Sequence, residues 1–267
     1  MNHNGQPTIS VMMPCFNNSK FIEQAIRSVL DQDVAADLEL VIVDDASTDD
    51  SVQLIRSLGE ERIRLLPNET NSGISKVRNQ LLAAARGDFI TSLDGDDYYA
   101  SNQKLSAELN LLMANDHQRC VAYSDIEMVD ATGKSLARSS DISPPQEGIL
   151  FQGMLDRRIM IPRDFLVARE LAQSVGGFDE SLSIYEDWDY KLRLAQRATF
   201  AYTGQIGIGY RRHGGGLSAA KGRVHRDHIA RIRRKHGIQA MGGDPMKLVR
   251  IAGRVTGMIS RKTSKAA

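Results

Sequence analysis

Residues 89–97 read FITSLDGDD, an apolar run that ends in three carboxylates within four residues, Asp94, Asp96 and Asp97. Carboxylates packed this closely raise one another's proton affinity, and a hard divalent cation held by oxygen ligands relieves that repulsion. A cation bound here would in turn attract an anionic substrate. The segment therefore predicts a buried strand that ends in a site for metal-dependent chemistry on an anion.

The first half of the chain alternates short apolar runs with helical patterns, which is typical of βαβ units. The expected strands are residues 9–13, 38–43, 63–66 and 89–93, and the expected helices are residues 20–32, 51–57 and 74–85. Near-continuous apolar strands indicate a sheet covered on both faces, and right-handed crossovers make such strands parallel. The sequence predicts a Rossmann-like α/β fold, with a mostly parallel sheet flanked by helices.

Polar and acidic residues follow each of these strands. Residues 14–17 follow the first strand, Asp44 and Asp45 the second, residues 68–73 the third and residues 94–97 the fourth. Ligands of open α/β sheets bind beyond the carboxyl ends of the strands, so these groups are expected to converge on one edge.

The second half is less regular. A hairpin turn is expected at residues 130–134, a flexible loop at 139–148, a helix at 186–197 and a strand at 207–212. The strand ends in His213 and a run of glycines, which lack side chains and so allow a close approach to a ligand.

The length of 267 residues, 42% of them hydrophobic, allows one large domain with a tail. No run of eighteen apolar residues and no basic-then-apolar leader is present, so a cytoplasmic protein is expected. Cys15 and Cys120 have no metal-ligand spacing and are expected to be reduced core thiols.

Charge divides the chain at Lys221. From there on the sequence has 13 Lys and Arg against 2 Asp and Glu, whereas the residues before it have 21 against 31. We therefore expect a domain at 1–220 and a basic helical tail at 221–267.

Seven motifs occur in the order seen in family 2 glycosyltransferases, and the resemblance covers roughly residues 9–218. The motifs are SVMMPCFNN at 10–18, VIVDDASTD at 41–49, NSG at 71–73 with RN at 78–79, LDGDD at 93–97, GGFDE at 176–180, EDWD at 186–189 and YRRH at 210–213. The chain resembles an inverting, GT-A-type enzyme of this family. The resemblance implies a nucleoside diphosphate sugar as donor, with a UDP-sugar favoured.

The resemblance places the nucleotide at the ends of the first three strands. Asp45, and with it Asp44, is implied to bind ribose or base; capping of the next helix is an equal explanation for one of the two. Pro14 fixes the backbone as it leaves the first strand, and Phe16 offers an apolar face against the base; Asn17 is implied to belong to the same site. Phe16 stands where relatives often carry Tyr, so contacts from a phenol oxygen are absent here. Asn71 and Gly73 are implied to belong to the same site, and the simpler explanation for both is that they shape the turn.

The resemblance implies Mn²⁺ or Mg²⁺ at Asp94-Gly95-Asp96. Asp96 is the expected direct ligand, and Asp94 is expected to hold the ribose or a metal-bound water. For His213, a role as a further metal ligand and a structural role are equal alternatives. Asp97 has the alternative of capping the following helix. Arg78, within a helix, is expected to reach the diphosphate or a base-binding carboxylate.

Asp187, preceded by Glu186, matches the family's base position. Direct displacement at the anomeric carbon needs a base on the face opposite the leaving group, which Asp187 supplies while Glu186 orients the acceptor. The competing explanation is a pair of acids stabilised by the helix dipole.

The basic tail contains two helical patterns, at 221–236 and 246–259, and the second has an apolar face suited to anionic lipid. Docking of that apolar face on the domain or on a second subunit explains the pattern as well as lipid binding does. A homo-oligomer is therefore one of the alternatives. Nucleic acid is not expected, since the tail lacks aromatic residues.

These features predict a metal-dependent inverting glycosyltransferase, a hexosyl- or N-acetylhexosaminyltransferase, that acts on a glycan or lipid-linked acceptor of a surface polysaccharide at the inner membrane face. A non-catalytic scaffold that binds nucleotide sugars and is tethered by its tail is the main alternative. A sugar nucleotidyltransferase or a dinucleotide oxidoreductase is disfavoured, because no glycine-rich phosphate loop follows the first strand. The sequence leaves the sugar, acceptor and linkage open.

Overall fold

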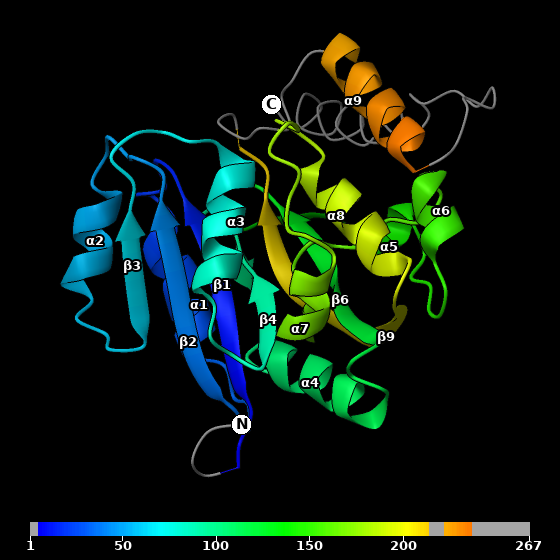
Figure 1. Cartoon of the computed structure of the whole chain (residues 1–267). Helices are drawn as coiled ribbons and strands as arrows, with labels where there is room; N and C mark the ends of the chain where they lie inside the picture. Colours follow the sequence, from blue (N-terminus) through cyan, green and yellow to red (C-terminus); the bar gives the residue numbers. More distant parts are fainter. Residues whose placement is uncertain (1–4, 214–221, 237–267) are drawn as a thin grey trace, which may run out of the picture.

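A single mixed sheet forms the centre of the computed structural model, which describes residues 5–213 and 222–236 (Figure 1). The strands are β1 (Thr8–Cys15), β2 (Asp37–Asp44), β3 (Ile63–Pro67), β4 (Phe89–Ser92), β5 (Tyr98–Tyr99), β6 (Cys120–Val129), β7 (Ser135–Arg138), β8 (Leu166–Ala168) and β9 (Thr199–Arg211). The helices are α1 (Ile22–Leu30), α2 (Ser51–Ser57), α3 (Ile74–Ala84), α4 (Lys104–Ala114), α5 (Ser139–Ile142), α6 (Phe151–Leu155), α7 (Arg169–Ser174), α8 (Glu186–Ala195) and α9 (Gly222–Lys235).

The first half folds as the predicted βαβ units. Strands β3, β2, β1 and β4 lie side by side and are parallel, as expected for strands joined by crossover helices. Cys15 pairs with Asp44, and Asp44 pairs with Pro67, so β1, β2 and β3 end level with one another. Their loops therefore meet at one edge of the sheet.

The second half adds strands of both directions, in the order β4-β8-β6-β9-β5 with β7 on β6. Strand β8 is antiparallel to β4 and β6, whereas β6 and β9 are parallel. The predicted turn at 130–134 does join an antiparallel hairpin, β6 and β7. The fold class is confirmed, with antiparallel strands in this half.

The prediction of a loop at 139–148 is wrong for its first four residues, which form α5. Asp125 Oδ1 accepts the backbone N–H of Ser140 at 3.1 Å and also the Ser139 hydroxyl. These bonds bring a buried carboxylate to the start of the segment and stabilise a helical turn there.

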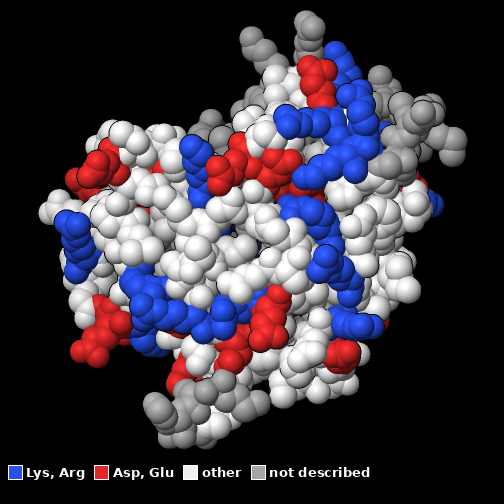
Figure 2. Space-filling model, viewed as in Figure 1, with Lys and Arg blue, Asp and Glu red and all other residues white. Residues whose placement is uncertain are grey.

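Helix α9 is the cationic helix predicted at the start of the tail, and it packs against the sheet domain. Its Ile229 and Ile232 are buried in the main hydrophobic cluster. Lys235 Nζ lies 2.8 Å from Asp179 Oδ2 and 3.0 Å from Asp189 Oδ2. Figure 2 shows Lys and Arg side chains gathered where α9 lies in Figure 1.

The helix predicted at 246–259 and the glycine run after His213 lie outside the described residues, and the division of the chain at residue 220 stays a prediction. Within the described part of the chain, no helix combines the length and apolar character needed to cross a bilayer.

The turn into β4 has no room for a side chain at Gly87. A Cβ there would lie 2.6 Å from the backbone nitrogen of Ser10 and 2.8 Å from the carbonyl oxygen of Thr8. Because both atoms belong to the β1 backbone, we expect Gly87→Ala to lower the free energy of unfolding by about 1–3 kcal/mol in urea titrations.

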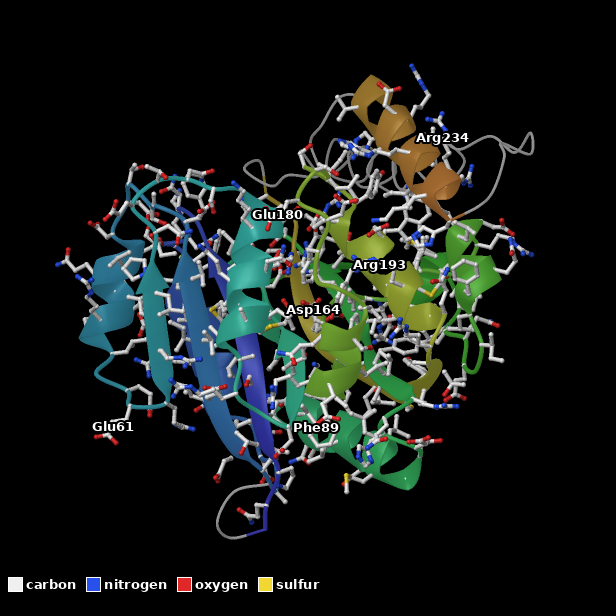
Figure 3. The ribbon with its side chains drawn as sticks, in the orientation of Figure 1. Glu61, Phe89, Asp164, Glu180, Arg193 and Arg234 are labelled. Carbon is white, nitrogen blue, oxygen red and sulfur yellow. The ribbon has the colours of Figure 1, made fainter. Side chains whose placement is uncertain are left out.

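The control for that variant is Glu61→Ala, at an exposed turn on the periphery (Figure 3). It is expected to change the free energy of unfolding by less than about 0.5 kcal/mol. Equal stabilities of the two variants would contradict the close contact between β1 and Gly87.

Candidate active site

An acidic cluster follows β4, as the sequence predicts. One ligand atom from each of Asp94, Asp96 and Asp97 can be chosen so that all three lie within 4.8 Å of one another. The Asp94 carboxylate is held between two arginines: Oδ1 is 3.0 Å from Arg78 Nη2, and Oδ2 is 2.9 Å from Arg163 Nη2. Part of the repulsion in the cluster is thus offset by the protein's own cations.

Asp97 lies inside this cluster and does not cap a helix, so the capping alternative is wrong. The next helix, α4, begins only at Lys104. The Asp97 Oδ2 atom is 2.7 Å from Arg163 Nη2, and Oδ1 accepts the backbone N–H of Arg211 at 2.8 Å. Burial raises the pKa of Asp97 well above its ordinary value, although Arg163 opposes the shift.

Asp96 faces His213 at the end of β9. Their side chains are about one quarter exposed, and Nε2 of the histidine lies 2.9 Å from Oδ2 of the aspartate. Between the acids, Gly95 donates its N–H to the Pro14 carbonyl at 3.2 Å, and a Cβ there would meet Asn18 at 3.0 Å. The structure thus brings the predicted metal-binding residues together beside the β1–α1 loop.

The two acids after β2 are buried and hold neighbouring loops. Asp44 accepts the N–H of Ser47 at 2.9 Å. Asp45 accepts the N–H groups of Ser72 at 2.8 Å and Gly73 at 2.9 Å. Burial raises the pKa of Asp45, but these hydrogen bonds outweigh it and bring the pKa below its ordinary value. Both carboxylates therefore hold the loops at the edge of the sheet where nucleotide binding is predicted.

The remaining residues predicted for the nucleotide site lie along the same edge. Pro14 is buried in β1, whereas the Phe16 side chain is 47% exposed and presents an apolar face to solvent. Asn17 has a φ of 54° and accepts the N–H of Thr48 at 2.8 Å. Asn71 donates to the Asp45 carbonyl at 3.2 Å.

Arg78 connects this edge to helix α8. Its Nη1 donates to the Ser92 hydroxyl at 3.1 Å, and its Nε lies 3.3 Å from Glu186 Oε1. The side chain is buried, so the ion pairs with Asp94 and Glu186 are shielded from water. One guanidinium fixes the acidic cluster and the predicted base segment relative to each other.

Glu186 and Asp187 open α8, directly after Tyr185 with its left-handed φ of 64°. Asp187 Oδ2 lies 2.9 Å from Lys191 Nζ, one helical turn on. Burial raises the pKa of Asp187, but Lys191 above all, then Arg163 and Arg78, lower it to about 2. Burial and the Asp187 charge raise the pKa of Glu186. Asp187 is therefore ionised at neutral pH, the state a proton acceptor needs.

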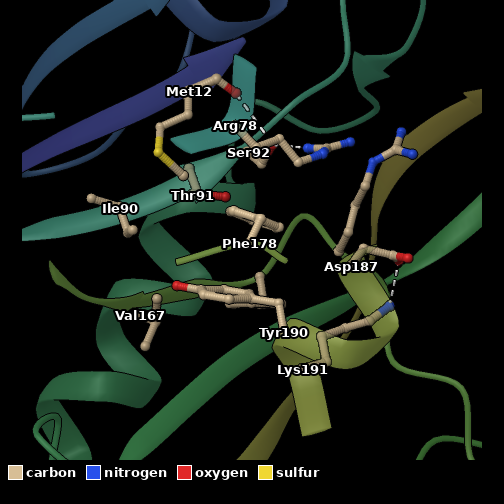
Figure 4. Close-up of a pocket in the computed structure, with 12 residues that line it drawn as sticks. Met12, Arg78, Ile90, Thr91, Ser92, Val167, Phe178, Asp187, Tyr190 and Lys191 are labelled. Atoms are coloured by element: carbon tan, nitrogen blue, oxygen red, sulfur yellow. Dashed lines mark hydrogen bonds and ion pairs between the residues drawn. The ribbon is translucent and has the colours of Figure 1, made fainter. Parts of the chain in front are cut away.

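A small cavity of about 20 Å³ joins these groups (Figure 4). Arg78, Arg163, Asp187 and Lys191 line it together with apolar side chains from the sheet and α8. In Figure 4 the Lys191 side chain points to Asp187, while Tyr190 extends along the apolar side of the cavity. The two arginines that contact the acidic cluster thus also border the predicted base.

A family model described as glycosyl transferase family 2 matches residues 10–175, more than half of the chain. The chain belongs to glycosyltransferase family 2. The match contains the sheet edge and the acidic cluster, and α8 with Asp187 follows it in the sequence.

Several curated family 2 relatives are similar to this chain. A putative colanic acid biosynthesis glycosyl transferase, WcaA of Escherichia coli, is 31% identical over 70% of this chain and 66% of its own length. The uncharacterized glycosyltransferase EpsJ of Bacillus subtilis is 37% identical over 75% of this chain and 52% of its own length. The chain spans from about a third to two thirds of the length of the first relatives it matches.

Solved structures show the same fold. Staphylococcus aureus TarS, residues 1–349, in complex with UDP-GlcNAc aligns with a TM-score of 0.66 and 22% identity over 84% of this chain and 66% of that chain. The complex of the same protein with UDP gives a TM-score of 0.64 over 88% of this chain and 67% of that one. At this identity the likeness establishes the GT-A fold alone.

Sequence reasoning missed three cations of the candidate site, Arg163, Lys191 and Arg211. Arg163 lies 66 positions from its partner Asp97, so no local pattern connects them. Arg211 likewise donates to the Asp96 carbonyl from the far end of β9. Lys191 carries a local signal, because it follows Asp187 at the i,i+4 spacing of helical ion pairs, and Arg211 stands within the YRRH motif at 210–213.

Proposed function

We propose that this protein transfers a sugar from a nucleoside diphosphate sugar, with UDP as the carrier, to an acceptor hydroxyl with inversion at the anomeric carbon. The observation that carries the proposal is the cavity at which Asp187 and the arginines of the acidic cluster meet. Membership of family 2 and the fold shared with TarS in its UDP-GlcNAc and UDP complexes support it.

The donor set fits Mn²⁺ or Mg²⁺. Three carboxylates with ligand atoms within 4.8 Å, and an imidazole beside one of them, supply the oxygen and nitrogen ligands these ions take. Asp96 would hold the ion, with His213 and Asp94 beside it. Such an ion, when bound, stabilises negative charge on a departing diphosphate.

Asp187 accepts the acceptor's proton in this proposal. Its ionised carboxylate lies at the cavity, and the acceptor oxygen attacks the anomeric carbon as its proton passes to that carboxylate. The bond from that carbon to the diphosphate oxygen breaks in the same step, and the nucleoside diphosphate leaves. Lys191 keeps Asp187 ionised but also lowers the basicity of its carboxylate. A weaker contact with Lys191 in the complex with donor and acceptor would make Asp187 a better base. Arg78 holds Glu186 beside it, where its carboxyl group can orient the acceptor.

The relatives and the charge of the chain support one class of acceptor. Two relatives are named for colanic acid and teichuronic acid biosynthesis. We therefore propose a glycan or lipid-linked acceptor in surface polysaccharide synthesis. The basic residues from Lys221 onward would keep the protein at the anionic inner face of the membrane.

Thermal shift and nucleotide release test the function together. In the presence of Mn²⁺, UDP at about one hundred times the Kd of UDP should raise the free energy of unfolding of the wild type by about 2.7 kcal/mol. Asp96→Ala should lose most of this gain. Turnover is the UDP released from UDP-glucose, UDP-GlcNAc, UDP-galactose or UDP-glucuronic acid with a polysaccharide primer.

Asp156→Ala is the matched control, because this aspartate pairs with Arg158 on the surface. It should keep the full Mn²⁺-dependent gain. Wild-type turnover in Asp96→Ala would refute metal dependence. A wild type that binds UDP with Mn²⁺ but releases none would instead favour the non-catalytic scaffold.

A further inference from the structure

Arg163 is a cation built into the acidic cluster. Its Nη2 lies 2.9 Å from Asp94 Oδ2 and 2.7 Å from Asp97 Oδ2, and its Nε lies 3.3 Å from Asp164 Oδ1. Its guanidinium also lies 5.7 Å from the centre of the Tyr210 ring. Three carboxylates from two segments thus converge on one guanidinium.

A buried network fixes the backbone next to Arg163. The Asp164 carbonyl accepts a hydrogen bond from Lys104 Nζ at 2.7 Å and from the Thr91 hydroxyl at 3.3 Å. Lys104 is fully buried and pairs with Glu108 at 2.8 Å. The backbone beside Arg163 is therefore held by buried contacts, and Arg163 is not a mobile surface arginine.

The arginines occupy the oxygens that a metal ion would use. Both oxygens of Asp94 bond to arginines, and those of Asp97 bond to Arg163 and to the N–H of Arg211. A divalent ion entering the cluster would meet the positive charge of Arg163 within a few ångströms, where charges repel strongly outside bulk water. A diphosphate that arrives with the ion supplies the negative charge that offsets this repulsion.

We propose that Arg163 makes divalent-ion binding depend on the nucleotide diphosphate. Arg163 lowers the affinity of the nucleotide-free site for the ion, and the diphosphate restores it. By linkage, the ion then raises the affinity for the nucleotide by the same factor. The inference rests on the proposed function, because it assumes that the ion and the diphosphate share this site.

Mn²⁺ binding tests the inference without any turnover. Isothermal titration with MnCl₂, alone and with saturating UDP, gives two dissociation constants for each protein. The wild type is expected to bind Mn²⁺ at least about tenfold more tightly with UDP, a coupling within the usual range. Arg163→Gln should bind Mn²⁺ alone at least about tenfold more tightly than the wild type, and its gain from UDP should shrink by that factor.

Two further variants separate charge from packing. Arg163→Lys keeps the positive charge and should retain the weak Mn²⁺ affinity of the wild type without UDP. Arg158→Gln removes an arginine that is 71% exposed and pairs with Asp156, and it should change neither constant. Circular dichroism and the melting temperature establish that each variant is folded.

The outcomes distinguish this inference from the proposed function. Equal Mn²⁺ affinity of Arg163→Gln and wild type would overturn the inference alone. If Arg163→Gln does not fold, the wild type decides the matter, since equal Mn²⁺ affinity with and without UDP also overturns it. A wild type that binds no Mn²⁺ even with UDP would reject the metal site in the proposed function, and the inference with it.

Discussion

Asp187→Asn is expected to lower kcat by about 100- to 10,000-fold, the range typical for loss of a general base. The amide has nearly the shape of the carboxylate but cannot accept the acceptor's proton. Asp187 lines the cavity and is ionised at neutral pH, with a pKa of about 2. Release of UDP from the preferred UDP-sugar with its acceptor measures the effect.

Two comparisons make that result specific. The stabilisation of Asp187→Asn by UDP with Mn²⁺ should match that of the wild type, because Asp187 is proposed to contact the acceptor and not the diphosphate. Asp156→Asn, at an exposed ion pair, should keep the full rate. A kcat within tenfold of the wild type would remove Asp187 from the role of base. Lost UDP binding would assign it to the donor instead.

Arg78→Ala is expected to lower the free energy of unfolding by about 3–5 kcal/mol, as when one partner of a buried ion pair is removed. The side chain is 5% exposed and bonds to Asp94, Ser92 and Glu186. Its loss leaves two carboxylates facing each other without their shared cation. Urea titration followed by far-ultraviolet circular dichroism measures the change.

Arg27→Ala provides the comparison for a surface pair. Arg27 lies 2.7 Å from Glu23, but its side chain is 61% exposed, so its removal should cost at most about 1 kcal/mol. A similar small loss in Arg78→Ala would mean that the Arg78 pairs do not connect α3 to α8 energetically. Near-normal stability with lost turnover would indicate a role confined to substrate binding.

Much of the first half of the fold could be predicted because its signals are local. Apolar strands and helical spacing place β1 to β4 within a few residues, and the parallel order follows from the crossovers. The edge with Asp44, Asp45 and the acidic cluster then follows from strand ends alone. Arg78 was placed at this edge from the family motif, and the structure adds its link to Glu186.

The rest depends on contacts between distant segments. Strand β8 has three residues and runs antiparallel between β4 and β6, which no periodicity indicates. Arg163 meets Asp97 only because β8 brings its segment beside β4. The sequence suggested nucleotide contact for Asp45, whose buried carboxylate also holds the loop before α3, a role visible only in three dimensions.

The docking of α9 also orders events as the chain is made. His236 lies 3.1 Å from Asp189, two residues past the proposed base, and its side chain is 4% exposed. The strands β1 to β4 leave the ribosome early, whereas Asp189 meets His236, a partner within the described part of the chain, only when residue 236 emerges. During synthesis the edge formed by β1 to β4 can therefore fold before the segment of the proposed base meets His236.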